Sequence, residues 1–102
     1  MDSEEEYETV RQQMQASLSQ KQAVQLQFNE IKRTIEEVEK SGENDDLYEL
    51  VGQVLIKKKK SEILEGLKDK KDILEFRLNS LNKSIESDTK RLQELQKTIE
   101  KI

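Results

Sequence analysis

The sequence contains no cysteine and no histidine. Without cysteine the chain cannot form a disulfide or a cysteine-rich metal site, and a reducing compartment is compatible with its composition. Without histidine it lacks the commonest general base and the commonest metal ligand. Carboxylates, Lys and Tyr remain as the only possible catalytic groups. We name no catalytic residue, no metal site and no cofactor for this chain.

Long apolar segments are also missing. No run reaches the roughly eighteen apolar residues that a membrane-spanning helix needs. The chain begins "MDSEEEYE", which is acidic where a secretory signal would be basic and then apolar. These features predict a soluble, cytoplasmic protein that does not bind membranes.

Proline and tryptophan are absent as well, and apolar residues make up 32% of the 102 residues against 39% charged ones. That proportion is too low for a thick globular core, so one domain with little buried interior is expected. Glu, Lys, Leu, Gln and Ile dominate, which is typical of long helices that pair along a narrow apolar seam.

Two stretches carry the 3-4 apolar spacing of a coiled coil. In the first, the seam positions are Tyr7, Val10, Met14, Ser17, Lys21, Val24, Phe28, Ile31, Ile35 and Val38. In the second, they are Leu64, Leu67, Lys71, Leu74, Leu78, Leu81, Ile85, Asp88, Leu92, Leu95, Ile99 and Ile102. Polar seam residues such as Lys21, Lys71 and Asp88 more often set the register of a coil than bind a partner.

The distribution of charge predicts how the two stretches pair. Residues 1–56 carry 5 Lys and Arg against 13 Asp and Glu, whereas residues 57–102 carry 13 against 9. Opposite net charges favour an antiparallel intramolecular hairpin of helices, with paired position numbers adding to about 102. Capping residues place the first helix at 4–41 after Ser3, with Gly42 as its C-terminal cap, and the second at 61–102 after Ser61.

Residues 42–60 interrupt the helical pattern. "SGENDD" is rich in turn formers, and "LYELV" and "VLIKK" are short β-prone runs on either side of Gly52-Gln53. Glycine at the first central position is typical of a type II′ turn, so a β-hairpin is predicted here.

The predicted hairpin cannot bury its own apolar side chains. These lie on both faces, and a lone two-stranded ribbon is marginal in water. They belong to Leu47, Tyr48, Leu50, Val51, Val54, Leu55 and Ile56. Either hairpins of several subunits join edge to edge, or the hairpin folds down onto its own helices. We favour the first interpretation, which makes these residues and Gly52 an assembly element.

This arrangement resembles the prefoldin family, specifically its β-type subunit with a single central hairpin. The most specific features are Tyr48 shortly before Val51-Gly52, the aliphatic Val54 to Ile56, and Lys57 to Lys60 before a helix. The Gln-rich first helix is also similar to the family's, and the resemblance runs from about Gln12 to the end.

The resemblance implies a mainly α fold: a long antiparallel two-helix coiled coil whose central hairpin joins an intersubunit β-barrel. It also implies that residues 1–102 form one prefoldin-like domain. It further implies a hetero-hexamer of two α-type and four β-type subunits. Such a complex is an ATP-independent chaperone that holds unfolded client proteins between its coil tips. It delivers them to a group II chaperonin in the cytosol.

The free helix ends are the expected client-binding region. Loosely packed ends with apolar surface suit weak binding of unfolded chains. The candidates are Tyr7, Val10, Met14, Leu92, Leu95, Ile99 and Ile102. Apart from Ile99 and Ile102, which overhang in the expected register, these residues could equally complete the seam.

Three other interpretations compete with this one. The run Lys57 to Lys60 could bind nucleic acid, but the chain is acidic overall and no aromatic residue is interleaved with these lysines, so a solvated strand end is favoured. A structural or adaptor coiled coil would use the same seam without any hairpin assembly. An enzyme is not expected, because two helices and a ribbon form no pocket.

Overall fold

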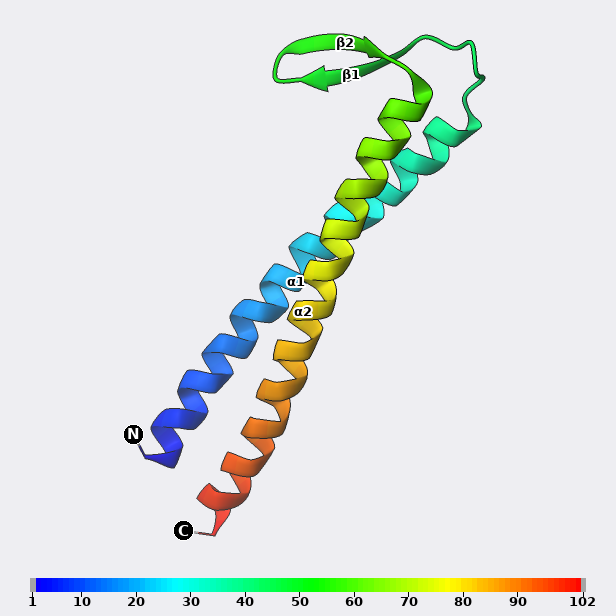
Figure 1. Cartoon of the computed structure of the whole chain (residues 1–102). Coiled ribbons are helices and arrows are strands. Elements are labelled where there is room, and N and C mark those ends of the chain that lie inside the picture. Colours follow the sequence, from blue (N-terminus) through cyan, green and yellow to red (C-terminus); the bar gives the residue numbers. More distant parts are fainter. Residues whose placement is uncertain (1, 102) are drawn as a thin grey trace. The chain divides into compact units, whose positions relative to one another are not determined.

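The computed structural model describes residues 2–101 and has the helix, hairpin, helix order that the sequence predicts. The elements are α1 (Ser3–Lys40), β1 (Leu47–Val51), β2 (Val54–Lys58) and α2 (Lys60–Glu100), as Figure 1 shows. They form two compact units. The first contains the residues up to Gln25 and those from Phe76 onward, and the second contains Leu26–Glu75.

Within each unit the predicted seam is the shielded side of both helices. The first unit buries Val24, Leu78 and Leu95, and the second buries Ile35 and Leu74. The other seam positions are half-buried, whereas most positions between them are exposed. Ile102 lies outside the described residues. The 3-4 spacing therefore predicted the contact surface of both helices, because only residues at that period share one helix face.

The helix starts differ from the predicted capping residues. Asp2, not Ser3, caps α1: its Oδ1 accepts a hydrogen bond from the Glu5 amide at 2.8 Å, and its carbonyl accepts from the Glu6 amide at 3.0 Å. A carboxylate suits this position because it also interacts favourably with the positive end of the helix dipole.

The second helix likewise begins before the predicted cap, since Ser61 already lies inside α2. The Lys59 carbonyl accepts the amides of Glu62 and Ile63, both at 3.1 Å. Because β2 ends at Lys58 and α2 begins at Lys60, Lys59 alone separates the strand from the helix.

The end of α1 also corrects a prediction. Gly42 does not adopt the left-handed conformation expected of a C-terminal cap: among residues 2–101, Gly52 is the one glycine with a positive φ. Instead, the amide and hydroxyl of Ser41 both donate to the Val38 carbonyl. A tight turn follows, in which the Gly42 amide donates to the Asp45 carboxylate at 2.6 Å.

Lys60 closes the end of α1 from the start of α2. Its Nζ donates to the carbonyl oxygens of Glu39 and Ser41 at 3.1 and 2.8 Å, and Glu43 lies 3.7 Å away. Only 16% of the Lys60 side chain is exposed, so these bonds are partly shielded from water. A cation at the C-terminal carbonyls of a helix is favourable, and here it fixes the two helices to each other at the root of the hairpin.

Replacing Lys60 with methionine should therefore destabilise the chain by about 1–2 kcal/mol, because two carbonyl groups lose a charged donor and the apolar stem is kept. Chemical denaturation followed by circular dichroism measures this difference. Lys59→Met is the matched control, since its side chain is exposed and its capping carbonyl is retained. Equal stability of the two variants would mean that the Lys60 contacts contribute nothing.

Candidate functional site

The hairpin has the turn that the sequence predicts. β1 and β2 are antiparallel, and Val51 pairs with Val54 across the two-residue loop Gly52-Gln53. Gly52 has φ of 64°, whereas no described non-glycine residue has a positive φ. A positive φ at the first central residue alone is the type II′ pattern, in contrast to type I′, which needs two.

The register divides the hairpin side chains between two faces. One face carries Leu47, Glu49, Val51, Val54, Ile56 and Lys58, and the other carries Tyr48, Leu50, Leu55 and Lys57. Each face is apolar next to the turn, and its charged residues lie from the middle of the ladder, where Glu49 is opposite Ile56, to the end away from the loop.

An ion pair at the root joins the strands on each face. Lys57 lies 3.0 Å from Asp46, and Lys58 pairs with Glu49. Their hydrogen bond holds the pKa of the Glu49 carboxyl below its usual range, and that of Lys58 above its own. The Asp46 carboxylate likewise raises the pKa of Lys57. All three shifts favour the charged forms, so the root keeps its charges at neutral pH.

The apolar part of the hairpin is open to solvent on both faces. Leu50 and Leu55, which are direct cross-strand partners, are each 65% exposed, and Tyr48, Val51, Val54 and Ile56 are exposed as well. Leu47 is half-buried. The hairpin is thus not folded down onto its own helices, which was the competing interpretation. An apolar surface of this kind on a folded chain marks an interaction site.

Both edges of the hairpin also present unpaired backbone groups. In an antiparallel pair, residues whose amides and carbonyls bond across the ladder alternate with residues whose groups point outward. Because Val51 and Val54 flank the two-residue turn, the outward residues are Tyr48 and Leu50 on β1 and Leu55 and Lys57 on β2. Each edge can accept another strand.

The candidate residues at the helix ends lie together in the first unit. Tyr7, Val10 and Met14 of α1 are half-buried, as are Leu92 and Ile99 of α2. Leu95 differs, because only 3% of it is exposed and it is a core residue of this unit. Of the six described client-binding candidates, one is therefore fully packed, and the other five keep part of their apolar surface exposed to solvent.

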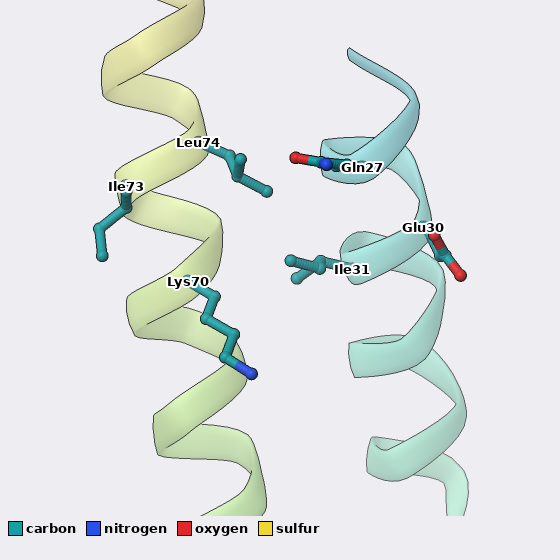
Figure 2. A pocket seen from close by; sticks show the side chains of 6 residues that line it. All are labelled: Gln27, Glu30, Ile31, Lys70, Ile73 and Leu74. Atoms are coloured by element: carbon teal, nitrogen blue, oxygen red, sulfur yellow. The ribbon is translucent and has the colours of Figure 1, made fainter. Parts of the chain in front are cut away.

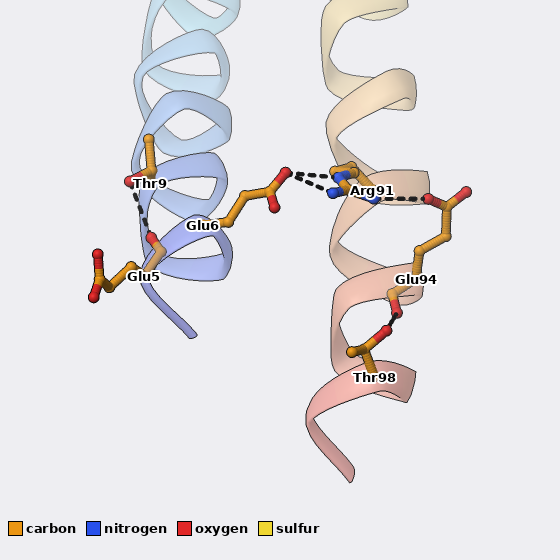
Figure 3. Close-up of polar contacts among 6 residues, drawn as sticks. All are labelled: Glu5, Glu6, Thr9, Arg91, Glu94 and Thr98. Atoms are coloured by element: carbon orange, nitrogen blue, oxygen red, sulfur yellow. Dashed lines mark hydrogen bonds and ion pairs between the residues drawn. The ribbon is translucent and has the colours of Figure 1, made fainter. Parts of the chain in front are cut away.

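Charged groups join the two helices beside these residues (Figure 3). Nε and Nη2 of Arg91 donate to one oxygen of Glu6 at 2.9 and 2.6 Å, and Nη1 donates to Glu94 at 3.2 Å. The two acids raise the pKa of Arg91, Glu6 most strongly. The sequence predicted antiparallel pairing but not this contact, since it depends on which long side chains flank the seam.

Met14 supplies a second contact between the helices. The Thr89 hydroxyl lies 3.5 Å from its Sδ, next to the Asp88 position that the predicted register places opposite Met14. The same hydroxyl is 2.7 Å from the Ile85 carbonyl. A hydroxyl has one proton to donate, and the carbonyl is the better acceptor, so the sulfur contact is mainly van der Waals packing.

The second unit has a shallow groove beside its seam. It is lined by Gln27, Glu30, Ile31, Lys70, Ile73 and Leu74. In Figure 2, Ile31 and Leu74 point toward each other from the two helices, while Glu30 and Ile73 lie at the outer margins. Ile73 is exposed and lies off the predicted seam. The groove is therefore the flank of the helix pair, with an open side and mixed charge.

Among residues 2–101, no three acidic side chains lie close enough together to hold a metal ion. Neither helix is long and apolar enough, over the described residues, to cross a membrane.

Comparisons with known proteins bear on the whole chain. A family model described as "Prefoldin subunit" matches residues 2–102. The prefoldin β subunits of Pyrococcus furiosus and Thermococcus onnurineus are 38% and 40% identical to this chain over 93 residues, which cover 91% of it and 80% of each relative.

A solved structure agrees with the sequence matches. The crystal structure of the prefoldin β subunit from Thermococcus strain KS-1 superposes with a TM-score of 0.93 at 32% identity, covering 97% of this chain and 87% of that one. The resemblance noted from the hairpin sequence is confirmed. The chain belongs to the prefoldin β-subunit family, whose members are non-enzymatic chaperone subunits of the prefoldin complex.

Proposed function

We propose that this chain is a holding subunit that binds non-native proteins without ATP, as part of a hetero-hexamer of two α-type and four β-type subunits. The hairpins form the assembly platform, the free helix ends hold the client, and a group II chaperonin in the cytosol receives it. The observation that carries the proposal is the open hairpin, where six apolar side chains are exposed and the outward backbone groups of both edges face away from the ladder in the described part of the chain.

Assembly follows from the cost of leaving that surface in water. Burying a large aliphatic or aromatic side chain contributes about 1.5–3 kcal/mol, and the hairpin presents six that are exposed. Neighbouring strands can cover these side chains and satisfy the outward amides and carbonyls at the same time. The assembly residues are therefore those of the predicted set: Leu47, Tyr48, Leu50, Val51, Gly52, Val54, Leu55 and Ile56.

Client holding is placed at the helix ends for a different reason. Tyr7, Val10, Met14, Leu92 and Ile99 are half-buried, so each offers apolar surface without leaving the seam. Partial exposure of this kind suits weak contact with many sequences, and the flexible thioether of Met14 adapts to different side chains. Leu95 is packed in the seam, so a client reaches it only when the helices part. Ile102 completes the proposed set.

The competing function is an adaptor coiled coil that holds no clients. The two are separated by mixing the chain with α-type prefoldin subunits and weighing the product by native mass spectrometry. A holding subunit enters a hexamer, whereas an adaptor stays a monomer or dimer.

Removing residues 92–102 should abolish holding but leave assembly intact, because the hairpin belongs to the other compact unit. The reconstituted complex is tested without ATP for suppression of the aggregation of an unfolding protein. We expect full suppression with the complete chain and aggregation close to that in buffer with the shortened one. Loss of the hexamer in the shortened chain would contradict the separation of the two roles.

A further inference from the structure

Leu95 is buried at a place where helices usually fray. It lies near the end of α2, yet only 3% of it is exposed, the same fraction as for Val24 in the middle of α1. Terminal turns ordinarily open at little cost in free energy. Burial this close to a helix end therefore requires that the neighbouring turns of the two helices stay closed.

The ion pair between Glu6 and Arg91 lies beside this position. Glu6 is in the first turn of α1, and Arg91 precedes Leu95 by one turn of α2. Two N–H groups of Arg91 donate to the same oxygen of Glu6, at 2.9 and 2.6 Å. Figure 3 shows the Glu6 side chain reaching across to Arg91. The contact thus joins the helices next to the buried leucine.

Arg91 is also oriented by its own helix. Its Nη1 donates to Glu94 at 3.2 Å, which holds the guanidinium in a fixed position toward α1. The Arg91 side chain is 45% exposed and that of Glu6 is 34% exposed, so water weakens their attraction without abolishing it. Such a contact shifts the balance between closed and parted helix ends, and it still breaks reversibly.

We propose that Glu6 and Arg91 form a latch that keeps the free helix ends closed over Leu95 and thereby limits how tightly a client is held. With the ends closed, a client contacts only the half-buried residues. With the ends parted, Leu95 adds apolar surface, so binding becomes tighter and release slower. The inference rests on the proposed function, because it takes the helix ends as the holding site. Glu6 and Arg91 act as positioning residues, through Leu95.

Two variants open the latch, Glu6→Gln and Arg91→Gln. Each removes one charge of the pair, and circular dichroism checks that the helices remain. Because both remove the same contact, the double variant should behave like either single one. Glu5→Gln is the matched control. It removes an acid from the same turn and the same helix dipole, but Figure 3 shows Glu5 pointing away from Arg91.

Opening is measured by amide hydrogen exchange and mass spectrometry on the complex assembled with α-type subunits. Exchange over residues 92–99 should become about two- to fivefold faster in both latch variants, which is the range expected for losing an exposed ion pair. The Glu5→Gln complex should exchange like the wild type.

Holding is measured on the same complexes with reduced lysozyme, which aggregates as an unfolded chain. The concentration of complex that halves aggregation should fall by about two- to fivefold in the latch variants, and labelled lysozyme should leave them more slowly. An ion pair that only stabilises the fold predicts the opposite, because looser helix ends would then hold less.

Unchanged exchange in Glu6→Gln would overturn the latch. Faster exchange with unchanged or weaker holding would overturn its role in limiting client binding. A wild-type complex that failed to suppress the aggregation of lysozyme would instead overturn the proposed function and the inference with it, so the two failures are distinguishable.

Discussion

Replacing Leu50 with aspartate is expected to leave the chain folded and to exclude it from the prefoldin complex. Leu50 is 65% exposed in the isolated chain, so its free energy of unfolding should change by less than about 0.5 kcal/mol. In the complex, the same carboxylate would be buried among apolar side chains without a partner. That costs several kcal/mol, and a loss of even 2.7 kcal/mol weakens assembly about a hundredfold.

The matched control is Leu26→Asp. Leu26 is 71% exposed, so this change also places a carboxylate at the site of an exposed leucine, but on α1 instead of the hairpin. Native mass spectrometry with α-type subunits should show a normal hexamer for this variant and none for Leu50→Asp. If Leu50→Asp assembled as well as the control, the Leu50 face would not be buried in the complex.

The sequence predicted the helix pair and the hairpin well because both depend on local, repetitive chemistry. Seam residues such as Val24 and Leu78 are buried since apolar side chains at a 3-4 period can only face one side of a helix. The predicted type II′ turn was also correct, because Gly52 lies at the position where that turn needs a positive φ.

The errors occurred where several residues could do the same task. Asp2 and Ser3 are both good N-terminal caps, and propensity alone does not choose between neighbours. Gly42 could have closed α1 by its own conformation. Instead, the side chain of Lys60 donates to carbonyl groups at the end of α1 that are nineteen residues or more away in the sequence. A contact of this range depends on how the helices lie at the root of the hairpin, which residue type and spacing do not encode.

For the candidate sites, too, the sequence predicted which residues take part but not how they are arranged. The sequence identified the apolar hairpin residues, but their sorting into two faces and the ion pairs Asp46–Lys57 and Glu49–Lys58 depend on the register. At the helix ends the predicted register left Ile99 overhanging, but it did not decide whether Leu95 contacts clients or only completes the seam. The structure separates them, because Leu95 is buried and Ile99 is not.

That difference allows seam packing to be distinguished from client contact. Leu95→Ala should destabilise the chain by about 2–3 kcal/mol, since a residue with 3% exposure loses its packing and leaves a cavity. Ile99→Ala should cost less, about 1 kcal/mol, because Ile99 is only half-buried and lies in the last turn of α2. Urea denaturation followed by circular dichroism measures both changes.

Holding should rank the two variants in the opposite order if Ile99 contacts clients. Assembled complexes with Ile99→Ala should suppress aggregation less than those with Leu95→Ala, once both are compared at a temperature where each remains folded. The reason is that Ile99 offers apolar surface to a client in the folded chain, whereas Leu95 has almost none to offer. If holding instead fell in proportion to the loss of stability in both variants, these residues would serve only to complete the seam, and client contact would have to lie elsewhere on the arms.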